Sequence, residues 1–265
     1  MFPSTIWIIL AVCALMCSIG FYKFVYFLSV GYGFAVTGAG IAILLLYGKT
    51  LSMWTILMCV LFVIYGIRLG GFLLIREIKS ASYRKTLNHA TKTEKPMPIF
   101  VKATIWACVS VMYVLQVSPV FYRASNGDTA NIFAIIGTII MAIAILIESL
   151  ADKQKSAAKK LNPNRFCDTG LYTIVRCPNY LGEVLFWTGV LISGIGAVQG
   201  LQWIIAILGY ILIVYVMLSG AKRLELRQNK NYGDNPEYQA YVKKTPIIFP
   251  LIPLYHLENV KWIVV

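Results

Sequence analysis

Long apolar segments follow one another along most of this chain, with short polar connections between them. A helix that crosses the ~30 Å hydrocarbon core of a bilayer needs about 20 such residues. Segments of this kind fall at roughly residues 4–22, 24–47, 51–75, 98–120, 130–150, 180–198 and 201–219. The first of them lacks the basic start and the cleavage site of a signal peptide. The pattern predicts an all-α, polytopic transmembrane helix bundle of about seven spans.

The composition agrees with a membrane location. Hydrophobic residues make up 58% of the chain and charged residues 13%, whereas soluble proteins carry about 25% charged residues. The mean hydropathy is +0.72. A net charge of +13 does not by itself indicate nucleic acid, because basic cytoplasmic loops give multi-span proteins the same excess. We therefore expect an integral membrane protein that contacts membrane lipids and binds no nucleic acid.

The basic residues predict the orientation of the spans. They gather in alternate connections, at residues 76–97, at residues 151–179 and in the tail beyond residue 220. The connections on the other side carry only Lys49 and Arg123. With seven spans, this distribution puts the N-terminus outside and the C-terminus in the cytoplasm. No repeat or linker divides the chain, so residues 1–265 are expected to form one domain.

The cysteines and histidines give no sign of a metal site. The six cysteines include no CxxC pair, and His89 and His256 have no neighbour at ligand spacing. Cys167 and Cys177 fall in a connection that we place in the cytoplasm, where thiols stay reduced. We predict neither a bound metal nor a disulfide.

Ionisable residues are rare inside the predicted spans, and their positions are informative. Arg68 lies in the third span, with Tyr65 on the same helical face. Glu148 and Asp152 lie four residues apart at the cytoplasmic end of the fifth span, and Glu183 lies near the same end of the sixth. Taken singly, Arg68 could snorkel and Asp152 could be an interfacial acid. Their clustering at one depth favours a functional site.

The segment RFCDTGLYTIVRCPNYLGEVLFWTG, residues 165–189, passes from a polar turn into an apolar helix. Pro178 suits the first turn of that helix, and Asn179 and Glu183 share one of its faces. Free N–H groups at a helix N-terminus favour an anion. Three basic residues precede this terminus: Lys159, Arg165 and Arg176. They predict a phosphate-bearing ligand from the cytoplasm; alternatively, they only retain the loop inside and contact anionic lipid head groups.

These residues resemble the steroid 5-alpha-reductase-like membrane reductases, including bacterial relatives. The resemblance is best in IESLADKQK (147–155), in residues 162–189 and in YQAYVKKTPIIFP (238–250). The pattern Arg-x-Pro-x-Tyr-x-Gly-Glu at residues 176–183 is also similar to that of isoprenylcysteine carboxyl methyltransferases and phospholipid methyltransferases. Those enzymes share the architecture but bind S-adenosylmethionine.

The resemblance implies an NADPH-dependent oxidoreductase that acts on CH–CH groups. Its substrate would be a lipid-like enone, such as a steroid, sterol or isoprenoid, admitted from the bilayer. The resemblance places the substrate among the helices of residues 1–120, and the cofactor among residues 130–265 with their cytoplasmic cap. It also implies a bacterial inner membrane and a site facing the cytoplasm. The oligomeric state is left open.

The resemblance also assigns individual residues. Tyr65 and Arg68 match a Tyr-x-x-Arg pattern, which places the tyrosine by the substrate ketone and the arginine by the cofactor. Tyr65 and Glu183 are the expected catalytic residues. Tyr232 is matched more loosely, because the spacing in the tail is longer here. The expected cofactor-binding residues are Arg68, Asp152, Lys159, Arg165, Arg176, Asn179, Glu183 and Tyr232.

Two positions depart from the family pattern. Position 177 is Cys, where many bacterial relatives and the methyltransferases have His. The reductases proper often lack that His, so the change counts mildly against a methyltransferase. Steroid reductases pair the tyrosine with a Gln-Glu from an earlier helix, but here no acid precedes Glu77. The hydroxyls of Tyr26, Tyr32 and Thr37 are alternatives, so the substrate need not be a 3-keto-4-ene steroid. The competing hypotheses are a methyltransferase that uses S-adenosylmethionine, and a transporter or lipid-binding protein without a cofactor.

Overall fold

The computed structural model describes residues 2–79 and 97–264, and within these ranges it contains helices and no strand. Five helices are long and apolar enough to cross a membrane: α2 (Val30–Tyr47), α3 (Met53–Lys79), α5 (Ile99–Ser125), α6 (Ile132–Leu161) and α8 (Gln202–Tyr232). The predicted all-α fold is therefore confirmed, and the chain is an integral membrane protein. Several basic residues of the first predicted cytoplasmic loop lie outside the described residues: Arg84, Lys85, Lys92 and Lys95.

Two predicted spans correspond to shorter helices. The first, at residues 4–22, contains α1 (Ile6–Cys17) and a 3-10 turn, η1 (Ser18–Phe21). The sixth, at residues 180–198, contains α7 (Pro178–Ser193). Neither is among the five helices long enough to cross a membrane. The count of seven spans and the orientation of the chain therefore stay predictions.

Two helices continue beyond their predicted ends. We expected the fifth and seventh spans to stop near residues 150 and 219, but α6 runs to Leu161 and α8 to Tyr232. Hydropathy marks only the apolar part of such a helix, whereas Lys, Gln, Arg, Glu and Ala continue it because they are good helix formers. Lys159, which the sequence analysis placed in the connection at residues 151–179, consequently lies on α6.

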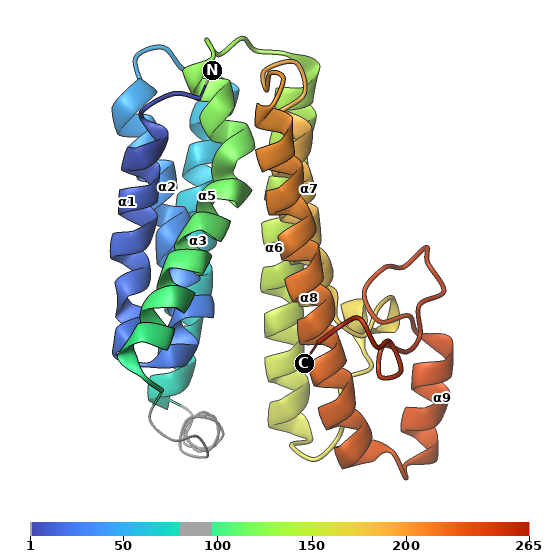
Figure 1. Cartoon of the computed structure of the whole chain (residues 1–265). Helices are drawn as coiled ribbons and strands as arrows, with labels where there is room; N and C mark the ends of the chain where they lie inside the picture. Colours follow the sequence, from blue (N-terminus) through green and yellow to red (C-terminus); the bar gives the residue numbers. More distant parts are fainter. Residues whose placement is uncertain (1, 80–96, 265) are drawn as a thin grey trace. The chain divides into compact units, whose positions relative to one another are not determined.

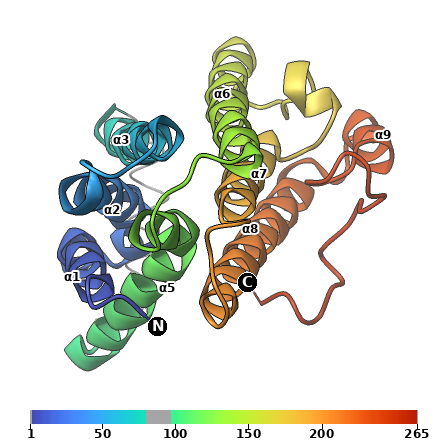
Figure 2. The same ribbon diagram turned by 90° about the horizontal axis from the view of Figure 1, so that it is seen from above.

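The chain divides into two compact units. Unit 1 consists of Met1–Thr138 and Val190–Gly209, and unit 2 consists of Ile139–Gly189 and Tyr210–Val265. Residues 190–209, which the sequence grouped with the cofactor-side helices, thus belong to unit 1. Within unit 1, α1, α2, α3 and α5 run side by side (Figures 1 and 2). Figure 2 shows these four helices end-on.

Glycines let α2 and α3 approach closely in unit 1. A Cβ atom added to Gly33 would lie 2.6 Å from the backbone oxygen of Gly66, and one added to Gly66 would overlap Gly33 and Thr37. Farther along, a Cβ atom at Gly40 would lie 2.8 Å from the oxygen of Cys59. Small residues at helix contacts allow this packing between membrane helices.

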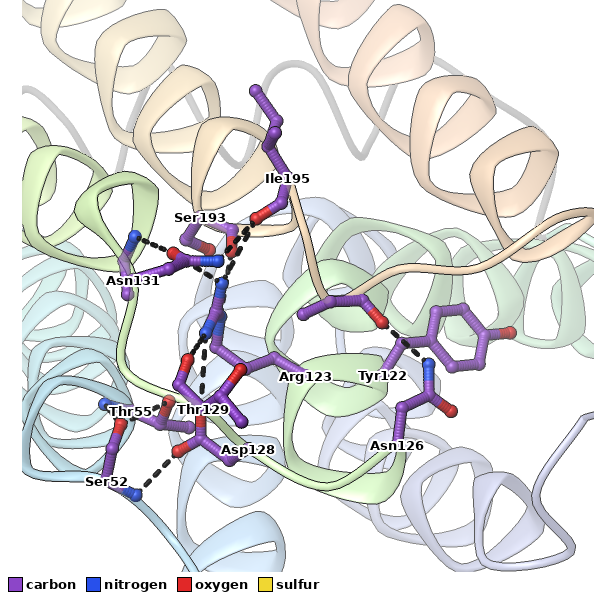
Figure 3. A network of polar contacts seen from close by, with 12 residues as sticks. Ser52, Thr55, Tyr122, Arg123, Asn126, Asp128, Thr129, Asn131, Ser193 and Ile195 are labelled. Atoms are coloured by element: carbon purple, nitrogen blue, oxygen red, sulfur yellow. Dashed lines mark hydrogen bonds and ion pairs between the residues drawn. The ribbon is translucent and has the colours of Figure 1, made fainter.

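A buried arginine joins three connections of unit 1 (Figure 3). Arg123, at the end of α5, is wholly enclosed. Its guanidinium pairs with Asp128 at 3.3 Å, and the other Asp128 oxygen accepts the backbone N–H of Ser52 at 2.6 Å. The guanidinium also donates to Ser193, Thr129, Asn131 and Ile195. The sequence had marked Arg123 only as one charge in an outside connection.

In unit 2 the tail folds back onto α8. Asn235 caps a short helix, α9 (Pro236–Lys244), by accepting the N–H of Glu237 at 2.8 Å. The following segment pairs with the turn before α7, where Arg176 and Cys177 donate to the backbone oxygens of Pro246 and Ile247, both at 2.9 Å. The start of α7, the helix α8 and the tail share an apolar core, which consists of Cys177, Ala221, Leu224, Ile247, Ile248, Leu257 and Ile263.

Candidate functional site

A pocket of about 250 Å³ opens in unit 2. It combines three cationic side chains, two amides and three aromatic rings. No carboxylate is among the lining residues that the structure describes. These residues are Lys155, Lys159, Phe166, Cys167, Tyr172, Leu224, Arg227, Gln228, Asn231 and Tyr232.

The extended ends of α6 and α8 build most of this pocket. Lys155 and Lys159 lie one turn apart on α6, and Arg227 and Asn231 lie one turn apart on α8. Residues at this spacing share a helical face. The sequence analysis missed the contributions of Lys155, Arg227 and Asn231, because it ended both helices too early. Their i, i+4 spacing was the signal that would have found them.

Two predicted site residues meet at the pocket wall. The ammonium of Lys159 donates to the hydroxyl of Tyr232 at 2.9 Å and lies 5.4 Å from the centre of its ring. It also donates to the backbone oxygens of Pro163 at 3.0 Å and Arg165 at 2.6 Å. An ammonium has three donors, so these contacts hold Lys159 in place. They bring together residues 73 positions apart in sequence.

Aromatic rings form a second wall. The ring of Phe166 stacks on Tyr241 with centroids 5.4 Å apart and meets Tyr232 at 5.9 Å. The hydroxyl of Tyr241 donates to the backbone oxygen of Tyr172 at 2.7 Å. Burial raises the pKa of Tyr172 and Tyr241 above the ordinary value of a phenol. The wall is therefore uncharged at neutral pH.

Arg165 lies outside the residues that line the pocket. Its guanidinium bridges Glu237 at 2.6 Å and Asp168 at 2.9 Å, and all three side chains are partly exposed. The hydrogen bonds that Arg165 donates to Asp168 and Glu237 raise the pKa of its guanidinium and keep it charged. The pair with Glu237 ties the segment after α6 to α9. The predicted contact of Arg165 with a phosphate stays a prediction.

The guanidinium of Arg176 pairs with other groups of the protein. Its guanidinium donates to Glu225 at 2.9 Å and to the backbone oxygen of Tyr255, and the side chains of Arg176 and Glu225 are both buried. The second oxygen of Glu225 accepts the backbone N–H of Leu257 at 2.7 Å. Arg176 thus joins the start of α7 to α8 and the tail. Its predicted role in binding an anion stays a prediction.

Helix α7 presents the acid that the sequence singled out. It begins at Pro178, as predicted. The carboxylate of Glu183 is buried and accepts the indole N–H of Trp187 at 3.0 Å, one turn along the same face. The side-chain oxygen of Asn179, one turn before Glu183, is buried without a hydrogen-bond partner among the described residues. This acceptor is suited to an N–H donor from a ligand.

Two further acids that the sequence analysis selected, Glu148 and Asp152, lie on α6. A Cβ atom added to Gly182 of α7 would overlap the side chain of Glu148, which is almost wholly buried. The two helices therefore meet closely at this point. Asp152, one turn later, is half-buried and lies near enough to Tyr172 to influence its ionisation.

Tyr65 and Arg68 belong to α3 in unit 1, whereas the other predicted site residues belong to unit 2. Tyr65 is wholly buried, and its hydroxyl donates to the hydroxyl of Tyr32 at 2.9 Å. Arg68 is half-buried. Of the three alternative hydroxyls, Tyr26 instead donates to Glu77 at 2.7 Å and Thr37 to the backbone oxygen of Gly33 at 3.0 Å. Tyr32 is the alternative hydroxyl bonded to Tyr65.

The part of the chain that the structure describes contains no group of three or more His, Cys, Asp or Glu side chains that could hold a metal ion. The six cysteines are unpaired. The absence of a metal from the working protein stays a prediction.

The comparisons with known proteins identify a family. The model of a family described as a protein of unknown function, DUF1295, matches residues 14–245. Because the match spans most of the chain, the protein belongs to this family, which is associated with steroid 5-alpha-reductase-like proteins. No curated protein and no solved structure matches the chain.

Proposed function

We propose that this protein is a membrane-embedded, NADPH-dependent reductase that transfers a hydride to the conjugated C=C bond of a lipid-like enone. The pocket of unit 2 carries the proposal. It places the cations of Lys155, Lys159 and Arg227 around one cavity, beside the rings of Phe166 and Tyr232. The family's association with steroid reductase-like proteins agrees with this chemistry.

The charge of the pocket favours NADPH over S-adenosylmethionine. NADPH carries several phosphate charges, and Lys and Arg side chains bind phosphate oxygens through charge-assisted hydrogen bonds. S-adenosylmethionine carries a sulfonium cation, which Lys155, Lys159 and Arg227 would repel. A methyltransferase is the competing hypothesis, since the motif at residues 176–183 is shared with that class.

The residues present fit the cofactor. We assign the phosphates to hydrogen bonds from Lys155 and Arg227, and the flat base to the aromatic wall at Tyr232. Lys159, whose three donors are held by Tyr232, Pro163 and Arg165, would contribute its positive charge. We assign the carboxamide of the nicotinamide to Asn179, whose buried oxygen has no donor among the described residues. Glu183 and Trp187, which are hydrogen-bonded to each other, would keep this face of α7 rigid. When bound there, the cofactor would supply the hydride, and its oxidation to NADP+ would balance the reduction of the substrate.

The chain's own groups then act on the substrate. As the β carbon of the enone accepts the hydride, negative charge develops on the carbonyl oxygen. The hydroxyl of Tyr65 is assigned to donate a hydrogen bond to this oxygen, which stabilises that charge. A proton from water completes the saturated ketone at the α carbon. The apolar helices exclude bulk water and strengthen the hydrogen bond.

Cofactor binding tests the proposal directly. Full-length protein in detergent is titrated with NADPH, followed by cofactor fluorescence, and separately with S-adenosylmethionine, followed by calorimetry. We expect NADPH to bind, and Lys155→Gln or Arg227→Gln to weaken its binding about 10- to 100-fold, since a charged hydrogen bond contributes about 1.5–3 kcal/mol. Lys160→Gln, an exposed neighbour outside the pocket lining, is the matched control.

Two results would overturn the proposal. Binding of S-adenosylmethionine without NADPH would put the methyltransferase hypothesis in its place. NADPH binding that is weakened equally by Lys160→Gln and Lys155→Gln would remove the pocket from the cofactor site.

A further inference from the structure

The tail of unit 2 returns to α8 at residues 260–264 (Figure 1). The ammonium of Lys222, on α8, donates to the backbone oxygens of Val260 at 2.8 Å and Ile263 at 3.0 Å. The side chain of Ile263 is buried and belongs to the apolar core that α8 shares with the tail. The segment of residues 260–264 is therefore attached to α8 by both polar and apolar contacts.

A second attachment lies two turns earlier on α8, at Tyr215. Its hydroxyl donates to the backbone oxygen of Trp262 at 3.4 Å and accepts the backbone N–H of Val264 at 3.2 Å. The ring centres of Tyr215 and Trp262 lie 6.3 Å apart. Within hydrocarbon no water is present to bond backbone groups, so protein must supply their partners. Side chains of α8 supply such partners to this segment.

The positions of the two attachments along α8 give their depth in the bilayer. The apolar part of α8 begins at Trp203, and its first charged residue is Lys222. At about 1.5 Å per residue this stretch is about 30 Å long, which equals the thickness of the hydrocarbon core. Lys222 therefore lies at the edge of the core, and Tyr215 lies about 10 Å inside it. Because the segment is bonded to both, it extends from the edge into the core.

The segment also exposes large apolar side chains at this depth. Trp262 is 64% exposed and Val264 is 71% exposed, whereas Ile263 between them is 2% exposed. Ile211, one turn before Tyr215 on the same helical face, is exposed as well. An exposed apolar side chain on a membrane-spanning helix faces lipid. Trp262 and Val264 therefore continue the lipid-facing surface of α8.

We infer that residues 260–264 form a membrane anchor, and that its partner is the acyl-chain region of the leaflet around the later part of α8. Trp262 suits this place, because an indole combines a large apolar ring with one polar N–H and is common near membrane surfaces. The ammonium of Lys261, an exposed residue, reaches the polar head groups, because long cationic side chains snorkel. The tail, predicted as a cytoplasmic cap, thus lies partly in the membrane. The inference does not depend on the proposed function.

The anchor holds the tail over a buried ion pair. Leu257 and Glu258, just before the segment, donate their backbone N–H groups to Glu225 at 2.7 Å and 3.1 Å. Glu225 in turn pairs with Arg176, in the turn before α7. Contact between lipid and residues 260–264 therefore restrains the part of the tail that covers this turn.

Fluorescence quenching of Trp262 tests the inference. The full-length protein and Trp262→Phe are reconstituted in nanodiscs of phosphatidylcholine or of phosphatidylcholine with brominated acyl chains. The difference between the two proteins gives the emission of Trp262. Bromine on the acyl chains quenches indoles within the bilayer, whereas iodide quenches indoles that water reaches. We expect brominated lipid to abolish most of the Trp262 emission and iodide to leave it unchanged.

Two indoles added to the otherwise unaltered protein provide matched controls. Val264→Trp places an indole at the other exposed apolar position of the segment, and brominated lipid should quench its added emission. This variant probes the same surface even if Trp262→Phe does not fold. Asp234→Trp places an indole beyond the end of α8, at least about 15 Å past Lys222 along the helix axis. Its added emission should be quenched by iodide and not by brominated lipid.

The relative effect of the two quenchers decides the outcome. Iodide quenching of Trp262 as strong as that of the indole in Asp234→Trp would place the segment in water. Protection of Trp262 from both quenchers would show that protein covers it, for example a second copy of the chain. Either result overturns the inference, which requires brominated lipid to quench Trp262 more strongly than iodide does.

Discussion

The guanidinium of Arg176 donates to the carboxylate of Glu225 across 2.9 Å, with both side chains almost completely enclosed. The two residues are 49 positions apart, and their ion pair joins the turn before α7 to the extended end of α8. Glu225 also accepts the backbone N–H groups of Leu257 and Glu258. Unit 2 is thus organised around one buried charge pair, because a buried ion is tolerated only with partners.

Removal of one partner should destabilise the protein. Glu225→Gln leaves the cation of Arg176 buried without its counter-charge, which costs about 3–5 kcal/mol, or on the order of 10 °C in Tm for a chain of this length. The measurement is thermal unfolding in detergent. Glu237→Gln, an acid-to-amide change at an exposed pair, should cost only about 0–1 kcal/mol. Equal losses in the two variants would contradict the structural role of Glu225.

The network of unit 1 predicts a second loss of stability. Asp128→Asn removes the charge that faces Arg123, and both of these side chains are wholly buried. We expect a cost of about 3–5 kcal/mol for breaking a buried pair, measured as the Tm in detergent. Asp234→Asn, at an exposed position, is the control and should leave Tm unchanged. An unaltered Tm in Asp128→Asn would show that the network contributes no net stability.

The contact between α2 and α3 should not accept a methyl group. A Cβ atom at Gly66 would overlap Gly33 and Thr37, whereas one at Gly71 of the same helix meets nothing within 4 Å. Gly66→Ala should therefore destabilise the protein by at least about 1–3 kcal/mol through overpacking. Gly71→Ala should be neutral or slightly stabilising, because Ala favours the helix. Thermal unfolding that places both variants at the same Tm would refute the close approach.

Asn179 should be dispensable for stability but needed for cofactor binding. Its buried oxygen has no hydrogen-bond partner among the described residues, and leaving a polar group unsatisfied costs about 1–3 kcal/mol. Asn179→Leu, a replacement of similar size, should therefore keep or raise the Tm. The same variant should weaken NADPH binding about 10-fold, a loss equivalent to about 1.4 kcal/mol. A lower Tm together with unchanged NADPH affinity would assign Asn179 to packing.

Cys177 should resist alkylation in the folded protein. Burial is the main cause that raises its pKa to about 12, while Lys155 and Arg176 oppose the shift. Since the thiolate is the reactive form, Cys177 should be labelled by iodoacetamide at pH 8.5 only after denaturation, as measured by peptide mass spectrometry. Rapid labelling of the native protein would show that the tail does not cover this residue.

The raised pKa of Cys177 also determines how the stability of the folded protein depends on pH. The folded protein holds the Cys177 proton to higher pH than the unfolded chain does, where the pKa is near 9.0. The stabilisation is therefore complete below about pH 9 and is lost as the pH rises toward 12. Burial raises the pKa of Tyr238 to about 12 as well, with the same sign. Stability in detergent should decrease above pH 9, and Cys177→Ala should make this decrease shallower.

Several features of the site followed from spacing along one helix. Pro178 begins α7, and Glu183 and Trp187 share a face and a hydrogen bond, because residues four apart are neighbours on a helix. The extended ends of α6 and α8 were missed for a related reason. Hydropathy shows where a helix leaves the apolar phase, not where its backbone hydrogen bonds stop. Lys155 and Arg227 therefore escaped prediction as pocket residues.

The sequence by itself determined that this is a helical membrane protein, because an apolar run must satisfy its backbone hydrogen bonds internally in lipid. It also selected Lys159 and Tyr232, which the structure brings together. Only the tertiary structure decided which side chains pair over long distances. It bound Arg176 to Glu225, enclosed Arg123 among three connections, and paired Tyr65 with Tyr32. These long-range pairs depend on how the helices pack. The periodicity of the sequence predicts which residues share a helical face, but it does not predict which residues of different helices come into contact.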